Sequence, residues 1–292
     1  MMFKRKSAVL GLALTGLAAL WLAYGATRTD PANPALWRVD GPAGQSAYLF
    51  GTIHALPRAA AWRTPKIAAA LDASDRIVVE IAAVNDDAAT ARAFQSLAHT
   101  PGQPPITDRV PANLRDKLAQ AIAVSGHQPA DFGDIETWAA ALMLAQGSAG
   151  DSDPRNGVDR ALINDARAKP IIELEGAQAQ LSIFDRLPEP AQRALLASVI
   201  SGGDEDANAL ALAWRTGNIA AIAGETHAGM LADPALREAL YVARNRAWSG
   251  AITTILGHGG HPFVAVGTAH MAGPDGLPAM LTARGYRVTR VE

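Results

Sequence analysis

Two copies of one short pattern lie near the opposite ends of this chain. The first, Y-L-F-G-T-I-H, ends at His54, and the second, F-V-A-V-G-T-A-H, ends at His270. Each is an apolar, strand-forming run that breaks at Gly-Thr and reaches a histidine two residues later. A buried strand that ends in glycine delivers the next side chains to the edge of a sheet, where functional sites usually lie. The pattern therefore predicts that two histidines separated by 216 positions meet at one sheet edge.

The other apolar runs indicate how the chain reaches that arrangement. We expect strands at 36–39, 47–50, 76–81, 170–174, 261–266 and 286–291, and short helices at 65–73, 157–169 and 276–284. Segments 86–147 and 177–255 have helical spacing interrupted by Pro and Gly, which predicts further helices. Because strands gather toward both ends, we expect an α/β fold. In it, N- and C-terminal strands form one mixed β-sheet, with a large helical block between them.

The first 27 residues have the pattern of an export segment. Lys4, Arg5 and Lys6 precede an uncharged run of Ala, Leu and Gly at 7–27. This order is typical of a signal peptide, and the run is also long enough to cross a bilayer. We therefore expect a signal peptide or membrane anchor at 1–27, a linker at 28–35 and one domain at 36–292. The domain is expected in the periplasm or otherwise exported, with residues 7–27 either cleaved or retained as an inner-membrane anchor.

The overall charge narrows the classes of partner. The formal net charge is −2, the sequence pI is about 6.4, and there is no cysteine. A chain with this charge has no excess of Lys and Arg from which to build the basic surface that nucleic-acid binding requires. We expect no nucleic-acid partner and contact with a membrane only through the N-terminal segment. Without cysteine, a disulfide and a lipoprotein anchor are both excluded.

Two histidines and one glutamate form the strongest candidate site. Glu80 lies in the apolar run R-I-V-V-E-I, and a buried carboxylate is costly unless it is paired or bound to metal. Together with His54 and His270 it provides the ligands of a divalent metal ion with open coordination positions, for which manganese, cobalt and zinc are candidates. Glu80 is then either the third ligand or the general base that activates water.

Four more polar residues are candidates for the same site. Glu175 stands at the end of a predicted strand, and Asp159 lies one turn into a predicted helix. Arg244 and Asn245 are neighbours on a helix in the last third of the chain. An arginine in such a site can hold a substrate carboxylate or phosphate, or stabilise an oxyanion.

Each candidate also has a structural alternative. A histidine after Gly-Thr can cap a turn, Glu80 can pair with an arginine, and Asp159 can be a first-turn charge favoured by the helix dipole. Arg244 can belong to a solvated helix face. We do not expect His227 or His261 to take part, because their surroundings are helical or turn-like. The chain has no G-x-S-x-G or H-E-x-x-H pattern, which disfavours serine hydrolases and zincins.

Taken together, these motifs resemble the TraB/GumN family, which also contains the Tiki proteases. The matching segments cover roughly residues 36–291 and comprise G-T-I-H-A-L-P at 51–57, V-V-E-I at 78–81, N-G-V-D at 156–159, I-I-E-L-E-G at 171–176, A-R-N-R-A-W at 243–248 and A-V-G-T-A-H-M-A-G at 265–273. The resemblance implies an α/β fold related to the erythromycin-esterase and haem-binding ChaN-like proteins. It also implies a metal-dependent, peptidase-like activity with His54, His270 and Glu80 at the site and an Arg-Asn element at Arg244 and Asn245.

Two hypotheses of function follow. In the first, the protein is an exported metal-dependent hydrolase, peptidase-like, that acts on a peptide or protein substrate through a His/His/Glu metal site. In the second, it is a non-catalytic periplasmic binding protein that sequesters a metal, a haem-like ligand or a peptide. A buried glutamate beside two histidines favours catalysis, whereas the lack of a second obvious acid–base group favours binding.

Overall fold

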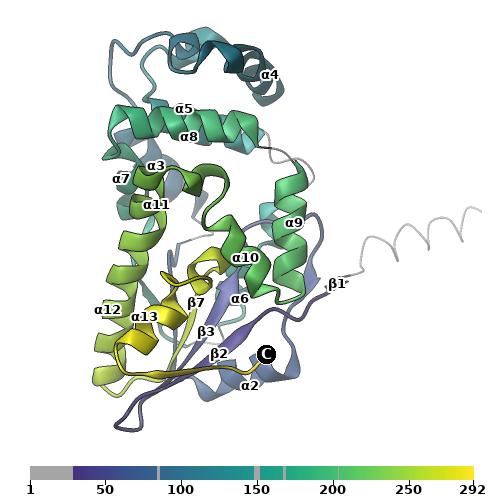
Figure 1. Cartoon of the computed structure of the whole chain (residues 1–292), viewed down its shortest axis with the longest axis vertical. Helices are drawn as coiled ribbons and strands as arrows, with labels where there is room; N and C mark the ends of the chain where they lie inside the picture. The colour runs from purple at the N-terminus through teal and green to yellow at the C-terminus, as the bar shows by residue number, and fades with distance from the viewer. Residues whose placement is uncertain (1–28, 84–85, 148–151, 167–168, 203) are drawn as a thin grey trace, which may run out of the picture.

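A computed structural model describes residues 29–292 except 84–85, 148–151, 167–168 and 203. The described chain contains a six-stranded sheet with the strand order β6-β5-β7-β3-β2-β8 (Figure 1). The strands are β2 (Leu36–Asp40), β3 (Ser46–Thr52), β5 (Arg76–Val79), β6 (Ile171–Glu173), β7 (Pro262–Gly267) and β8 (Arg287–Arg290). Strands from both ends of the chain lie side by side in this sheet, which confirms the predicted mixed sheet.

The register of the central strands brings the two Gly-Thr-x-His motifs together. β3 and β7 are parallel neighbours, with Gly51 opposite Val266 and Thr52 opposite Gly267. β5 and β6 continue the parallel part beyond β7, whereas β2 runs antiparallel to β3. The carboxyl ends of neighbouring parallel strands therefore meet at one edge, which is where ligands bind in open α/β sheets.

A helical block separates the N-terminal strands from β7, as the sequence predicts. The α-helices of the described residues are α2 (Pro65–Ala73), α3 (Asp87–Leu97), α4 (Arg115–Ser125), α5 (Thr137–Gly147), α6 (Val158–Asn164), α7 (Ala177–Asp185), α8 (Glu189–Ser201), α9 (Asp204–Arg215), α10 (Ile219–Glu225), α11 (Pro234–Arg237), α12 (Ala243–Gly257) and α13 (Leu277–Ala283), of which α3 to α12 lie between β5 and β7 in the sequence. Helices α3, α4, α5, α7 and α8 share an apolar core around Trp138 and Leu195. Figure 1 shows this block at one end of the molecule, beyond the sheet.

Helices also cover both faces of the sheet. Successive residues of a strand point to opposite faces. Phe50 of β3 accordingly packs in a cluster with Ile67 of α2. Its neighbour Leu49 belongs instead to the cluster around Trp248 of α12. With both faces buried, the ends of the central strands are held in fixed positions.

The strand that leads to Glu80 is shorter than predicted. The sequence predicts a strand at 76–81 with Glu80 inside it, but β5 ends at Val79. Gly176 has a φ of 80° and turns the neighbouring chain from β6 into α7, so β5 loses its ladder partner there. The Glu80 carbonyl oxygen accepts instead from the backbone N–H groups of Glu175 (3.1 Å) and Gly176 (3.2 Å). Glu80 therefore stands at the carboxyl edge of the sheet.

The N-terminal part of the chain is described only from Thr29. Two residues of the predicted linker, Asp30 and Pro31, form β1, which pairs in parallel with β4 (Ala60–Ala61). The predicted export segment at 1–27 lies outside the described residues.

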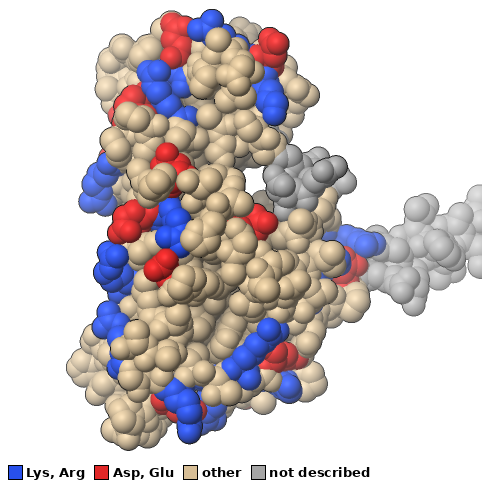
Figure 2. Space-filling model, in the orientation of Figure 1, with Lys and Arg blue, Asp and Glu red and all other residues tan. Residues whose placement is uncertain are grey.

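The surface of the described part is mixed in charge. On the face drawn in Figure 2, basic and acidic side chains are interspersed, and no continuous basic area is visible. Val124, Leu212 and Met230 are large apolar side chains that are exposed, each on a different element. Among the described helices, none combines the length and apolar character of a membrane span.

Candidate active site

The loop after β3 is held by the beginning of α6. The backbone N–H of Val158 donates to the carbonyl oxygen of Ile53 at 2.8 Å. Gly157 lies so close to this loop that a Cβ atom there would overlap the carbonyl oxygen of His54. The N-G-V-D segment therefore packs directly on the G-T-I-H segment, and only glycine leaves room for that contact.

This packing places Asp159 beside His54. Asp159 Oδ2 lies 2.7 Å from His54 Nδ1, and the Thr52 hydroxyl donates to the other carboxylate oxygen. Burial alone would raise the pKa of Asp159, but His54 and Thr52 hold that pKa below its ordinary value. Asp159 in turn raises the pKa of His54. The His54 side chain is 72% exposed, so solvent screens part of this attraction. Among the described residues, His54 Nε2 has no hydrogen-bonding partner.

Glu80 links β5 to β7. Its Oε1 accepts from the backbone N–H of Gly267 at 2.6 Å. Its Oε2 accepts from Arg244 Nη2 at 2.7 Å and from Gln180 Nε2 at 3.2 Å. Burial alone would raise the pKa of Glu80, but the positive charge of Arg244 and the hydrogen bond from the Gly267 N–H outweigh burial and lower the pKa. Glu80 is therefore an ionised carboxylate in a buried position.

Arg244 reaches the site from the first turn of α12, directly after a π-helical turn at Glu238–Val242. Its Nε and Nη2 atoms each donate to Glu175 at 2.9 Å, which makes a bidentate pair. Nη2 also donates to Glu80, and Nη1 donates to His270 Nε2 at 3.2 Å. The Arg244 side chain is only 11% exposed. It is a fixed positive charge that joins three elements of the site.

His270 follows β7 and is buried. Burial lowers the pKa of His270 to about 3, so the ring is neutral at pH 7. The Asn245 amide donates to the carbonyl oxygen of Asp275 at 2.7 Å, which leaves Asn245 Oδ1 to accept from His270 Nδ1 at 2.7 Å. The ring proton is therefore on Nδ1, and Nε2 accepts from Arg244. The Trp248 ring lies 4.5 Å from both the His270 ring and the Arg244 guanidinium carbon.

Three of these side chains converge over Gly267. A Cβ atom on this glycine would lie 3.2 Å from Glu80 Oε1 and 3.7 Å from His54 Nε2 and His270 Cδ2. His54 Nε2 and His270 Cδ2 are therefore separated by no more than twice 3.7 Å. The φ of Gly267 is −48°, which any residue adopts, so the glycine provides space here and not an unusual backbone conformation. The two motif histidines border one space, as the sequence predicts.

The structure brings all the residues selected from the sequence into this cluster, namely His54, Glu80, Asp159, Glu175, Arg244, Asn245 and His270. Sequence reasoning missed Trp248 and Gln180. Trp248 stands four residues after Arg244, so helical spacing puts both on one face and could have indicated the contact. Gln180 comes from α7, and no motif marks it. His261 lies at the opposite end of β7, and His227 is exposed after α10.

The metal ion predicted from the sequence would meet an arginine here. Glu80, Glu175 and His270 Nε2 all accept hydrogen bonds from Arg244. Within the part of the chain that the structure describes, no three His, Asp or Glu side chains form a group that could hold an ion. This donor set, as arranged, does not fit a resident divalent ion. The metal stays a prediction.

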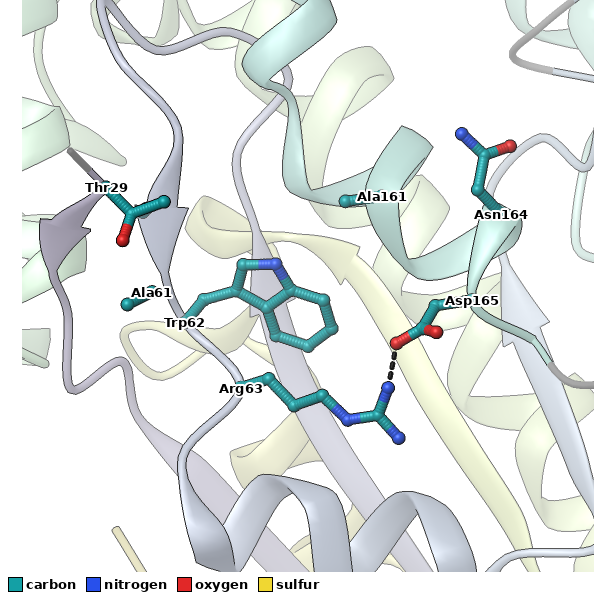
Figure 3. Close-up of a pocket in the computed structure, with 8 residues that line it drawn as sticks. Thr29, Ala61, Trp62, Arg63, Ala161, Asn164 and Asp165 are labelled. Carbon is teal, nitrogen blue, oxygen red and sulfur yellow. Dashed lines mark hydrogen bonds and ion pairs between the residues drawn. The ribbon is translucent and has the colours of Figure 1, made fainter. Parts of the chain in front are cut away.

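A separate groove of about 640 Å³ lies beside α6. Figure 3 shows the Trp62 indole along this groove, with Arg63 paired to Asp165 beside it. The lining residues are Thr29, Ala60, Ala61, Trp62, Arg63, Ala161, Asn164 and Asp165. No residue of the cluster around Gly267 lines this groove, so the two features are distinct.

Known proteins resemble this chain over most of its length. The chain is 25% identical over 246 residues to the uncharacterized protein YbaP of Shigella flexneri and, at the same identity, to that of Escherichia coli (strain K12). The matched region is 82% of this chain and 89% of each relative. No solved structure matches the chain significantly, so the expected relationship to erythromycin-esterase and ChaN-like folds stays a prediction. The TraB/PrgY/gumN family matches residues 35–290, a range that contains every residue of the cluster. The chain therefore belongs to the TraB/PrgY/gumN family.

Proposed function

We propose that this protein is an exported hydrolase that cleaves a peptide or protein substrate at the carboxyl edge of the sheet. The observation that carries the proposal is the His54–Asp159 pair: His54 Nε2, which has no partner among the residues that the structure describes, borders the space over Gly267 beside ionised Glu80. An imidazole that is held through one nitrogen by a carboxylate and open through the other is suited to moving protons. Export is proposed from the basic and apolar pattern at 1–27.

The proposed step is the addition of water to a peptide carbonyl carbon. Asp159 keeps the Nδ1 proton of His54 directed inward, so Nε2 takes a proton from water. The hydroxide adds to the carbonyl carbon, and the imidazole returns the proton to the leaving nitrogen as the C–N bond breaks. Arg244 supplies a fixed positive charge near the developing oxyanion. No step runs through a metal ion.

Substitutions in the His54–Asp159 pair test this proposal. His54→Ala is expected to lower kcat/KM on a fluorogenic peptide library by about 10²–10⁴-fold, the contribution of a positioned general base. His227→Ala is the control and is expected to leave the rate unchanged, because that side chain is exposed outside the cluster. Wild-type hydrolysis that survives His54→Ala at full rate would contradict the proposal.

The pH dependence gives a second measure of the same pair. Asp159 raises the pKa of His54 to about 9, so the unprotonated, basic form of His54 becomes abundant only as the pH rises above neutrality. We expect kcat/KM to rise with pH through the pKa of His54. Asp159→Asn removes the carboxylate charge and so lowers the pKa of His54. The rise of the remaining activity with pH should therefore begin at a lower pH than in the wild type. Histidine NMR titration of both proteins measures the two pKa values directly.

A non-catalytic binding protein is the second candidate, and one observation favours it. Glu80, Glu175 and Arg244 already satisfy one another, which suits a rigid wall of a binding site. Such a protein would sequester a peptide, a haem-like ligand or a metal. A ligand that copurifies with the protein, is identified by native mass spectrometry and is released unchanged, together with no turnover of any peptide, would favour this candidate.

A further inference from the structure

Arg244 contacts two of the three predicted metal ligands, Glu80 and His270, and also the further candidate Glu175. Its Nη2 atom lies 2.7 Å from Glu80 Oε2 and 2.9 Å from Glu175 Oε2. Its Nη1 atom lies 3.2 Å from His270 Nε2. Two carboxylates and an imidazole lone pair are donors that divalent transition metals bind. Here all three point at one guanidinium.

The surroundings of Arg244 fix the guanidinium in this position. The face of Trp248 lies 4.5 Å from the guanidinium carbon, which adds a cation–π contact to a side chain that is largely buried. Asn245, the next residue, holds the proton of His270 on Nδ1 and so presents the Nε2 lone pair to Arg244. Two successive residues of α12 therefore supply both the cation and the orientation of its imidazole partner.

We propose that Arg244 is the built-in cation of this site and excludes a divalent ion from the position between the two glutamates and His270. A metal ion there would compete with the guanidinium for the same donor atoms and would be repelled by its charge. The inference deepens the proposed function and rests on it for one consequence. Hydrolysis by the chelator-treated protein should need no added metal.

Ion binding to the full chain tests the inference without a substrate. Protein stripped with EDTA is titrated with Co²⁺, Mn²⁺ or Zn²⁺ and followed by calorimetry and elemental analysis. We expect no stoichiometric binding at this position in the wild type. Arg244→Ala frees the donor atoms and is expected to bind an ion at least about tenfold more tightly, because the internal competitor is gone. Arg246→Ala removes an exposed arginine of the same helix, and this matched control should behave as the wild type.

A spectroscopic readout locates the ion. In protein labelled with ¹⁵N-histidine, Zn²⁺ should leave the His270 Nε2 resonance unchanged in the wild type and shift it in Arg244→Ala. Adding Glu80→Gln to Arg244→Ala should remove most of the gained affinity. Arg244→Met keeps an aliphatic stem against Trp248 and replaces Arg244→Ala if the alanine protein does not fold. If neither variant folds, the wild-type titration decides.

Two results of the ion titrations would overturn the inference. One is a stoichiometric ion in the wild type that shifts His270, and the other is a folded Arg244 variant that gains no affinity. Failure of the proposed function gives different results from failure of this inference. Hydrolysis that stops on chelation and returns with an ion contradicts the built-in cation but leaves a hydrolase. Absence of hydrolysis with or without metal contradicts the hydrolase, while the ion titrations still decide the role of Arg244.

Discussion

Gly267 is the residue on which the space at the centre of the site depends. Gly267→Ala would place a methyl group 3.2 Å from Glu80 Oε1 and 3.7 Å from the nearest atoms of His54 and His270. Its backbone conformation suits alanine, so we expect the free energy of unfolding to change by less than about 1 kcal/mol. We expect kcat/KM to fall by about 10²-fold, because the substrate is displaced from the reacting groups. Thermal unfolding and peptide hydrolysis on the same samples measure both effects.

Gly51→Ala is the matched control in the neighbouring strand. A Cβ atom there would lie 2.7 Å from the Thr268 hydroxyl oxygen and 3.0 Å from the Thr268 Cα atom. This collision is with buried backbone, so we expect a loss of about 1–3 kcal/mol of stability from overpacking. If Gly267→Ala loses as much stability as Gly51→Ala, the role of Gly267 is to allow close packing. If Gly267→Ala keeps full activity, the reaction does not use this space.

The sequence indicates the chemistry of a single residue more readily than it indicates which other residue contacts it. The cost of a buried carboxylate indicates that Glu80 must be paired, and an arginine partner is one of the alternatives that this cost raises. Which arginine reaches Glu80 depends on where α12 lies relative to the end of β5. Nothing in the local sequence of either segment encodes the distance between them. The same limit applies to Gln180, whose contact with Glu80 exists only because α7 follows β6 at this edge.

At the scale of elements, the docking of α6 on the loop after β3 decides whether His54 meets Asp159. Gly157→Ala would drive a methyl group into the His54 carbonyl oxygen and bring it to 2.9 Å from the Pro154 carbonyl oxygen. We expect it to push the two segments apart and to cost about 1–3 kcal/mol of stability. In NMR titration, the pKa of His54 should move down toward that of an unpaired histidine.

The control for this prediction is Gly133→Ala in the helical block. Its Cβ atom would meet the Ala130 carbonyl oxygen at 3.5 Å, an ordinary contact. We expect little change in stability and none in the pKa of His54. If Gly157→Ala leaves both the stability and the pKa of His54 unchanged, the packing of the N-G-V-D segment does not position Asp159.

Element boundaries were predictable where local signals fix them. Helix α2 spans the predicted 65–73, because Thr64 accepts from the Ile67 N–H as an N-cap and Pro occupies the first turn. The predicted helix at 157–169 is shorter, since α6 ends at Asn164. Asp165 caps that end and pairs with Arg63, a residue about a hundred positions earlier. A tertiary contact of this kind leaves no periodic signal in the sequence.

At the scale of the whole molecule, strands from the C-terminal segment complete the sheet that the N-terminal strands belong to. β7 lies between β5 and β3, so the N-terminal strands do not form one sheet until the C-terminal segment has arrived. The matched motifs predict this long-range pairing because both must reach the same edge. The internal packing of the helical block has no such marker. Its helices are rich in Ala and Leu, and many arrangements of such faces bury similar apolar area.

The compartment is also a property of the whole chain, and the N-terminal pattern predicts it. A reporter enzyme that is active only outside the cytoplasm, fused after residue 35, should be active in cells, because Lys4, Arg5 and Lys6 stay inside and direct the following chain outward. The junction precedes β2, so the reporter replaces the whole main sheet and no incomplete part of the sheet is left in the fusion. A fusion that lacks residues 1–27 is the control and should be inactive. Sequencing of the mature N-terminus then separates cleavage after the apolar run from a retained anchor. Activity of a second reporter that works only in the cytoplasm, fused at the same point, would contradict export.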